Sequence, residues 1–187
     1  MELKNNDLVI GSSGRIGDQL VYRQRAGKTI IAKRPKKSSV QATALQMEVQ
    51  ELFTEAVLYA KAVIADEAKK AIYQAKAKAG KSAFNLALSD FCKAPEIRKY
   101  QASDYTGQVG DKISIRVIDD FKVEWVRLII KDSADNMIEE GEAVLSGNQV
   151  DWIYTATALN SNLAGTKLII SAADIPGNIS TQEVILG

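Results

Sequence analysis

Few side chains in this sequence have the type and spacing needed for catalysis. Histidine is absent from all 187 residues, which excludes every triad or dyad that depends on an imidazole base. The acidic pair Asp119-Asp120 falls in an expected turn between strands, where carboxylates usually bond backbone N–H groups. We therefore predict that the protein is not an enzyme and has no catalytic residues.

A glycine-rich segment, residues 11–17 (GSSGRIG), raises the alternative of a phosphate-binding loop. A nucleotide P-loop needs Gly-Lys-Ser/Thr after four intervening residues and then a helix, and neither follows Gly11. The surrounding residues also favour β-structure. We expect a glycine-linked turn here and no cofactor.

Four acids in the C-terminal part raise the alternative of a calcium site: Asp132, Asp135, Glu139 and Glu140. Their spacing does not match an EF-hand, and Glu139 and Glu140 face opposite sides of an expected strand. A solvated hairpin without a metal is the prediction. The single cysteine, Cys92, has no Cys or His neighbours, so we expect a buried free thiol.

The charges are strongly segregated along the chain. Residues 1–38 carry nine basic and three acidic side chains (+6), and residues 39–99 carry nine and seven (+2). Residues 100–187 carry six basic and thirteen acidic side chains (−7). The composition, 46% apolar and 25% charged, is that of an ordinary globular protein.

Three segments must position these charges, and together they predict an α+β multidomain fold. Residues 1–38 read as a basic β-hairpin arm with its turn at Ala26-Gly27, in which Leu20 and Tyr22 face one way and Val21, Arg23 and Arg25 the other. A hairpin of this size is not stable alone and needs a partner surface.

Residues 39–99 read as a helical segment. Apolar residues at three- and four-residue spacing predict a helix from a cap at Ser38 or Ser39 to about Ala79, either continuous or broken near Ala65-Asp66. A shorter helix is expected over residues 82–93, and the two pack as a helical hairpin around Gly80.

Residues 100–187 read as an all-β domain with turn signals every eight to twelve residues. Six strands are expected, at 112–118, 122–130, 137–145, 150–157, 167–172 and 181–186. Alternation such as Ile113, Ile115 and Val117 against Ser114 and Arg116 predicts a sandwich with one buried face per sheet.

The end of this domain resembles a bacterial immunoglobulin-like domain. The matching residues are Ala172 or Ala173, Asp174, Gly177 and Asn178, in an Ala-x-Asp-x-x-Gly-Asn turn between an apolar strand and a last strand. The resemblance covers about residues 105–187 and departs from antibody-type domains, because no cysteine pair flanks a core tryptophan; Trp125 or Trp152 would fill the core. It implies a spacer, adhesive or virion-associated module in which these residues form a turn.

The N-terminal pattern Gly11-x-x-Gly14-x-Ile16-Gly17, followed by Val-Tyr-Arg and a basic Lys-Arg-Pro, loosely resembles uncharacterised bacterial and prophage-associated proteins. This resemblance implies a structural component of a particle or filament. The first seven residues lack the apolar core of a signal peptide, and no apolar run reaches the ~20 residues that span a bilayer. We expect the protein to be made in the cytoplasm and not to insert into a membrane. Incorporation into a released particle is one possible destination.

The preferred hypothesis is a non-enzymatic structural protein that self-assembles head-to-tail, as a homo-oligomer or with other particle subunits. The basic arm of one subunit would bind the acidic C-terminal domain of the next. The expected arm residues are Tyr22, Arg23, Arg25, Ile31, Lys33 and Arg34. The expected acidic acceptors are Asp119, Asp120, Glu124, Glu139, Glu140 and Glu142.

Two other functions are kept as alternatives. In the first, the arm binds the phosphates of nucleic acid, although Tyr22 is its only aromatic residue for base stacking. In the second, the C-terminal domain is an adhesive or glycan-binding module with a ligand pocket near Trp125 or Trp152.

Overall fold

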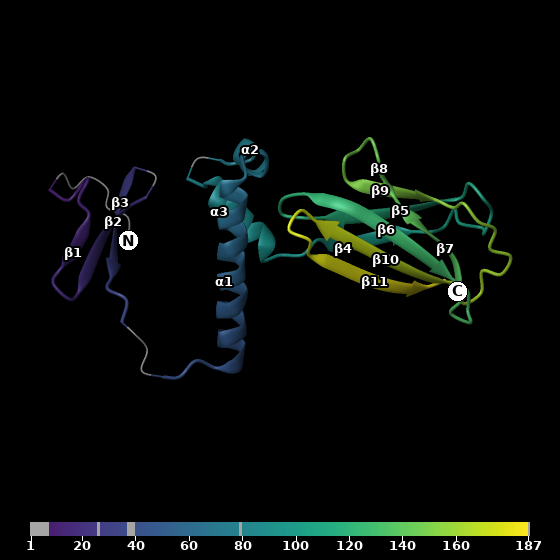
Figure 1. The fold of residues 1–187 in the computed structure, drawn as a ribbon, viewed down its shortest axis with the longest axis horizontal. Helices are drawn as coiled ribbons and strands as arrows, with labels where there is room; N and C mark the ends of the chain where they lie inside the picture. Colours follow the sequence, from purple (N-terminus) through teal and green to yellow (C-terminus); the bar gives the residue numbers. More distant parts are fainter. Residues whose placement is uncertain (1–7, 26, 37–39, 79, 187) are drawn as a thin grey trace.

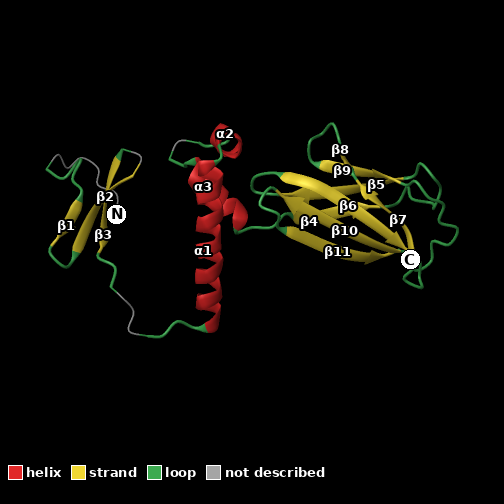
Figure 2. Ribbon diagram, in the orientation of Figure 1, coloured by secondary structure: helices red, strands yellow, loops and turns green. Residues whose placement is uncertain are grey.

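The computed structural model describes residues 8–25, 27–36, 40–78 and 80–186, which form an α+β structure. These residues hold three helices and three antiparallel sheets (Figures 1 and 2). We divide them into three parts: the N-terminal sheet (β1–β3), the helical segment (α1–α3) and the β-domain (β4–β11), which contains the other two sheets. No helix in the described ranges is long and apolar enough to cross a membrane.

The N-terminal sheet has three strands, β1 (Gly14–Ile16), β2 (Leu20–Arg25) and β3 (Lys28–Lys33), in the order β1-β2-β3. The sequence predicted β2 and β3 but not β1, which has only three residues. Gly27 has a φ of +75°, as the expected turn requires, whereas Ala26 lies outside the described residues. Figure 1 shows the sheet apart from the rest of the molecule.

The helical segment starts at α1 (Ala44–Ala65), and its cap is Thr43. The Thr43 hydroxyl accepts from the Gln46 N–H and the Gln46 side chain accepts from the Thr43 N–H, which forms a capping box. The expected caps, Ser38 and Ser39, lie outside the described residues.

A continuous helix to Ala79 is wrong, because the backbone becomes extended at Asp66. The Asp66 carboxylate accepts from the N–H groups of Ala68 and Lys69 and so starts α2 (Glu67–Ala75). The alternative of a break near Ala65-Asp66 is confirmed. Ser82 caps α3 (Ala83–Phe91), which packs on α1 and α2.

The β-domain contains two four-stranded sheets around one apolar core. One sheet has the order β11-β10-β6-β7 and the other β4-β5-β9-β8. The strands are β4 (Glu96–Gln101), β5 (Lys112–Ile118), β6 (Val123–Lys131), β7 (Met137–Glu142), β8 (Val144–Leu145), β9 (Asp151–Thr155), β10 (Lys167–Asp174) and β11 (Ile179–Ile185). Both sheets contribute fully buried side chains, among them Ile113, Ile115, Leu128 and Ile170.

Three further sequence expectations need correction. Strand β4 was not expected, and it crosses the expected domain boundary between residues 99 and 100. The strand expected at 137–145 is two strands in different sheets, β7 and β8. Cys92 is exposed, because it follows the last turn of α3 at the start of the linker to β4.

Candidate assembly surface

The strand register gives the N-terminal sheet a basic face. Arg15 pairs with Val21, Arg23 with Ile30 and Arg25 with Lys28, so these side chains project to the same side. A hollow on this part of the chain is lined by Arg15, Asp18, Val21, Arg23, Arg34, Pro35 and Lys36. Arg15, Arg23 and Arg25 are separated along the sequence but form one cationic surface in the structure.

The opposite face of the sheet is largely apolar. Ile16 pairs with Leu20 and Tyr22 with Ile31, and Ile16 and Leu20 are both exposed. This alternation is the one that the sequence predicted for β2. Large apolar side chains on a small exposed sheet are typical of a surface that is covered in an assembly.

The glycine-rich segment closes against the sheet and does not form a phosphate loop. The Gly11 N–H donates to the hydroxyl of Thr29 at 2.9 Å, and the Gln24 amide donates to the same hydroxyl and to the Ser12 carbonyl oxygen, both at 2.8 Å. Gly11, Gly14 and Gly17 all have positive φ. The expected turn is therefore only part of the segment, since Gly14–Ile16 form strand β1, and polar groups of the segment bond to β2 and β3.

The six expected arm residues thus lie on different sides of the sheet. Tyr22, Ile31 and Lys33 share the apolar face, whereas Arg23 and Arg25 lie on the basic face. Arg34 follows β3 and pairs with Asp18. They cannot contact one flat partner surface together.

Helix α1 adds a surface that the sequence analysis did not identify. Its 22 residues extend about 33 Å, whereas the nine residues of α3 extend about 14 Å. The apolar stripe is buried at Ala56, Ala60 and Val63, where α3 covers it. Figure 1 shows that the first turns of α1 extend past α3.

Toward its N-terminus the same stripe is bare. It continues through Leu45 (73% exposed), Val49 (65%), Leu52 (41%) and Phe53 (54%), which we call the bare half of α1. Periodicity alone cannot distinguish a covered stripe from an uncovered one. The sequence signal that could have revealed this uncovered surface was the difference in length between the first expected helix and the second, shorter one.

One of the six expected acidic acceptors is wrong. Glu139 is only 6% exposed, and its Oε2 accepts from the hydroxyl of Tyr154 and from the N–H and hydroxyl of Thr157. Its neighbour Glu140 is exposed, so the two do face opposite sides of β7. Glu139 is a buried hydrogen-bond acceptor inside the β-domain and cannot contact a partner.

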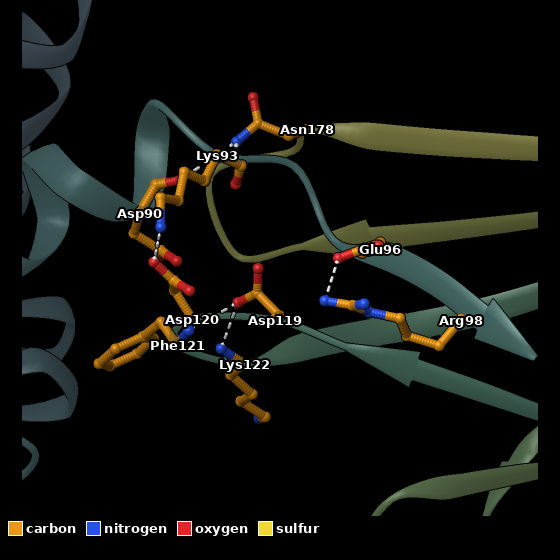
Figure 3. A network of polar contacts seen from close by, with 9 residues as sticks. All are labelled: Asp90, Lys93, Glu96, Arg98, Asp119, Asp120, Phe121, Lys122 and Asn178. Carbon is orange, nitrogen blue, oxygen red and sulfur yellow. Dashed lines mark hydrogen bonds and ion pairs between the residues drawn. The ribbon is translucent and has the colours of Figure 1, made fainter.

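The other five acceptors fall in three places. Asp119 and Asp120 lie in the β5–β6 loop, where Asp119 accepts from the N–H groups of Phe121 and Lys122 and Asp120 pairs with Lys93 (Figure 3). Glu140 and Glu142 lie on the edge strand β7, and both pair with Arg127. Glu124 is exposed on β6. Asp119 therefore has the turn role that the sequence predicted.

The acids weighed for calcium binding are dispersed, and the two tryptophans weighed for glycan binding have different surroundings. Asp132 accepts from groups of its own turn, and Asp135 pairs with Lys167 at 2.8 Å. Trp152 belongs to the core of the β-domain, as expected for one of the two tryptophans. The guanidinium of Arg127 lies 5.4 Å from the ring centre of Trp125. Trp152 also lines a hollow together with Phe121 and Leu145, so a pocket near one of the two tryptophans is present.

Comparisons with known proteins do not identify a family. No protein-family model matches the sequence, and no curated protein matches it. One solved structure, described as an engineered protein at 1.98 Å resolution, is 13% identical, with a TM-score of 0.35, over 59% of this chain and 30% of its own. The chain spans less than a third of that protein, and this likeness carries no argument.

Proposed function

We propose that the protein is a non-enzymatic structural subunit that assembles with copies of itself through its N-terminal sheet and the bare half of α1. The observation that carries the proposal is the pair of uncovered apolar surfaces. The apolar face of the N-terminal sheet and the first turns of α1 are both exposed in the single chain. Burying large apolar side chains contributes about 1.5–3 kcal/mol each, so a partner would stabilise both surfaces.

A second copy is the partner that the charges favour. Residues 1–38 carry a net charge of +6 and residues 100–187 carry −7, so the sheet of one copy is attracted to the β-domain of the next. The exposed acids Glu124, Glu140 and Glu142 are the proposed acceptors. A contact between two different surfaces is heterologous and produces a ring or a growing filament.

We also infer that the β-domain is an immunoglobulin-like sandwich that serves as a spacer. Its two four-stranded sheets share one core, and the β10–β11 turn has the Asp-x-x-Gly-Asn pattern of the resemblance. The Asp174 carboxylate accepts from the N–H groups of Gly177 and Asn178, and Gly177 has a φ of +94°.

The direct test is a chain that lacks residues 1–37. We expect the full chain to form rings, tubes or filaments in light scattering and electron microscopy, and the truncated chain to stay small. Circular dichroism controls for folding, because the helical segment and the β-domain remain intact. A truncated chain that assembles like the full chain would contradict the proposal.

Nucleic acid binding is the second candidate, favoured by the basic face of the N-terminal sheet. Arg15, Arg23 and Arg25 lie together there, and a cationic surface of this kind can bind a row of phosphates. Binding of labelled DNA and RNA by the full chain should weaken steeply between roughly 50 and 200 mM salt if this function holds. Binding that is insensitive to salt, or equal in the truncated chain, would argue against it.

A further inference from the structure

Three carboxylates meet where the helical segment joins the β-domain. Asp90 is in the last turn of α3, Asp119 is in the β5–β6 loop, and Asp174 is the last residue of β10. One oxygen of each lies within 4.8 Å of the others. Figure 3 shows Asp90 on the helical side of this junction and Asp119 on the strand side.

Two of the three carboxylates are buried and Asp119 is half-buried, and two oxygens of the cluster have no hydrogen-bond donor among the described residues. Asp90 is 1% exposed and Asp174 0%. Asp90 accepts from the Tyr73 hydroxyl at 2.6 Å through Oδ2, and Asp119 accepts from backbone N–H groups through Oδ2. The Oδ1 atoms of Asp90 and Asp119 are buried without a partner among the described residues. Unpaired buried carboxylate oxygens are costly unless a cation or a proton compensates them.

Lys76 is close enough to influence Asp90 but forms no ion pair with the cluster among the described residues. Lys76 donates to the Phe121 carbonyl oxygen, and its Nζ lies 4.5 Å from the ring centre of Phe121. Burial and the neighbouring Asp119 and Asp174 raise the pKa of Asp90 to about 7, although the Tyr73 hydroxyl and Lys76 oppose that rise.

We propose that Asp90, Asp119 and Asp174 bind a divalent cation, calcium in preference to magnesium, and that this ion fastens the helical segment to the β-domain. All three ligands are oxygens, the donors that calcium and magnesium prefer over the nitrogen and sulfur ligands of zinc. Calcium accepts irregular oxygen geometry, whereas magnesium demands near-ideal octahedral geometry and gives up its water reluctantly, so a largely buried site favours calcium. The 4.8 Å limit on the oxygen separations fits either ion.

The site differs from the calcium alternative that the sequence suggested. None of Asp132, Asp135, Glu139 and Glu140 belongs to this cluster. Its ligands come from three separate elements, so only the packed structure brings them together. Asp174 also holds the β10–β11 turn through its carboxylate, and a carboxylate oxygen has a second lone pair for a metal.

The test measures calcium binding by the full chain and by matched variants. Chelator-treated protein is titrated with calcium chloride and, separately, magnesium chloride, and thermal unfolding is followed. We expect calcium to raise the Tm by several degrees, since a ligand of the folded state alone stabilises it. Terbium is the optical probe: tyrosine-sensitised emission should appear because the Tyr73 hydroxyl contacts Asp90.

Asp90→Asn removes one charge and keeps an oxygen that can accept from Tyr73. We expect it to lose the calcium-dependent rise in Tm and at least tenfold in terbium affinity. Asp119→Asn is the second variant and changes a ligand in the β5–β6 loop instead of α3. It should lose calcium and terbium binding as Asp90→Asn does. Asp132→Asn is the control, because its carboxylate lies in an exposed turn outside the cluster, and it should respond like the parent chain.

Two results would overturn the proposal. If the parent chain responds to neither ion and Asp90→Asn raises the Tm without added metal, a shared proton holds the cluster. If Asp90→Asn and Asp119→Asn bind calcium as well as the parent chain, the ion is bound elsewhere. An equal response to magnesium would overturn the preference for the larger ion.

Discussion

Asn178 ties two distant parts of the chain together through one side-chain amide. Its Nδ2 donates to the carbonyl oxygens of Asp90 and Phe91, at 3.3 and 3.1 Å, and to Asp174 Oδ2 at 2.8 Å. The last carbonyl groups of a helix have no partner within the helix, so this amide serves as a C-terminal cap for α3. The sequence predicted only a role in the turn for Asn178.

Replacing Asn178 with Ala should therefore destabilise the protein. We expect a loss of about 1–3 kcal/mol in the free energy of unfolding, because half-buried acceptors lose their donor. Urea unfolding followed by tryptophan fluorescence gives the value. Asn136→Ala is the control: its Nδ2 donates to Asp132 in an exposed turn, and its loss should cost less. Equal losses would show that Asn178 does not join the two parts.

Asp151 provides a pH-dependent contribution within the β-domain. The Arg116 guanidinium bonds both carboxylate oxygens, at 2.7 and 2.9 Å, and lowers the pKa of Asp151 to about 2, with help from the Asn148 amide. Because the folded pKa lies below the usual value of about 3.9, the stabilisation is present above pH 4 and is lost as the pH falls toward 2.

The variant Asp151→Asn tests this sign. The difference in stability between the parent chain and the variant should be largest near neutral pH and should shrink between pH 4 and pH 2. Denaturant unfolding at pH 7, 4 and 2.5 measures it. A difference that stays constant over this range would mean that the ion pair does not stabilise the folded protein.

Residues with a local role were predictable, and residues with a long-range role were not. Asp174, Gly177 and Asp119 hold their own turns as the sequence indicated. The meeting of Asp90, Asp119 and Asp174 depends on how α3 packs against the β-domain. Glu139 was wrongly expected on the surface for the same reason. Strand alternation shows that Glu139 and Glu140 face opposite sides of β7, but it does not show which of the two sides is buried.

At the scale of the elements, α1 makes the clearest prediction. Phe53→Lys places a charge on the bare half, where 54% of the side chain is exposed, so the free energy of unfolding should change by less than about 0.5 kcal/mol. Assembly should nevertheless weaken, because the apolar contact is lost. Sedimentation velocity compares the variants.

Thr54→Lys is the matched control for this prediction. Thr54 is also exposed but lies on the opposite side of the helix, and its hydroxyl donates to the Gln50 carbonyl oxygen. It adds the same charge away from the stripe and should leave assembly intact. An effect as large as that of Phe53→Lys would mean that charge alone, and not the apolar stripe, controls the association.

Elements with strong periodicity were predictable from the sequence. Strand β5 has the expected bounds, and β6 differs by one residue at each end. Strand β4 was missed because its charged residues, among them Arg98 and Lys99, mask the alternation on a sheet edge. The length of α1 was overestimated because Asp66 interrupts the chain without breaking the apolar period.

At the scale of the whole molecule, the segregated charges give assembly an electrostatic component. The basic N-terminal sheet and the acidic β-domain lie at opposite ends of the structure (Figure 1). Their attraction across copies would be screened beyond about 8–10 Å at physiological salt. The apolar surfaces of α1 and the sheet would be much less sensitive to salt.

The most direct test of self-assembly is the mass of the full chain in solution, measured by light scattering over a range of concentrations at low and high salt. One chain has a mass of 20.4 kDa. We predict species much larger than this that grow with concentration at low salt and become smaller at high salt. A 20.4 kDa monomer under every condition would contradict the proposed assembly.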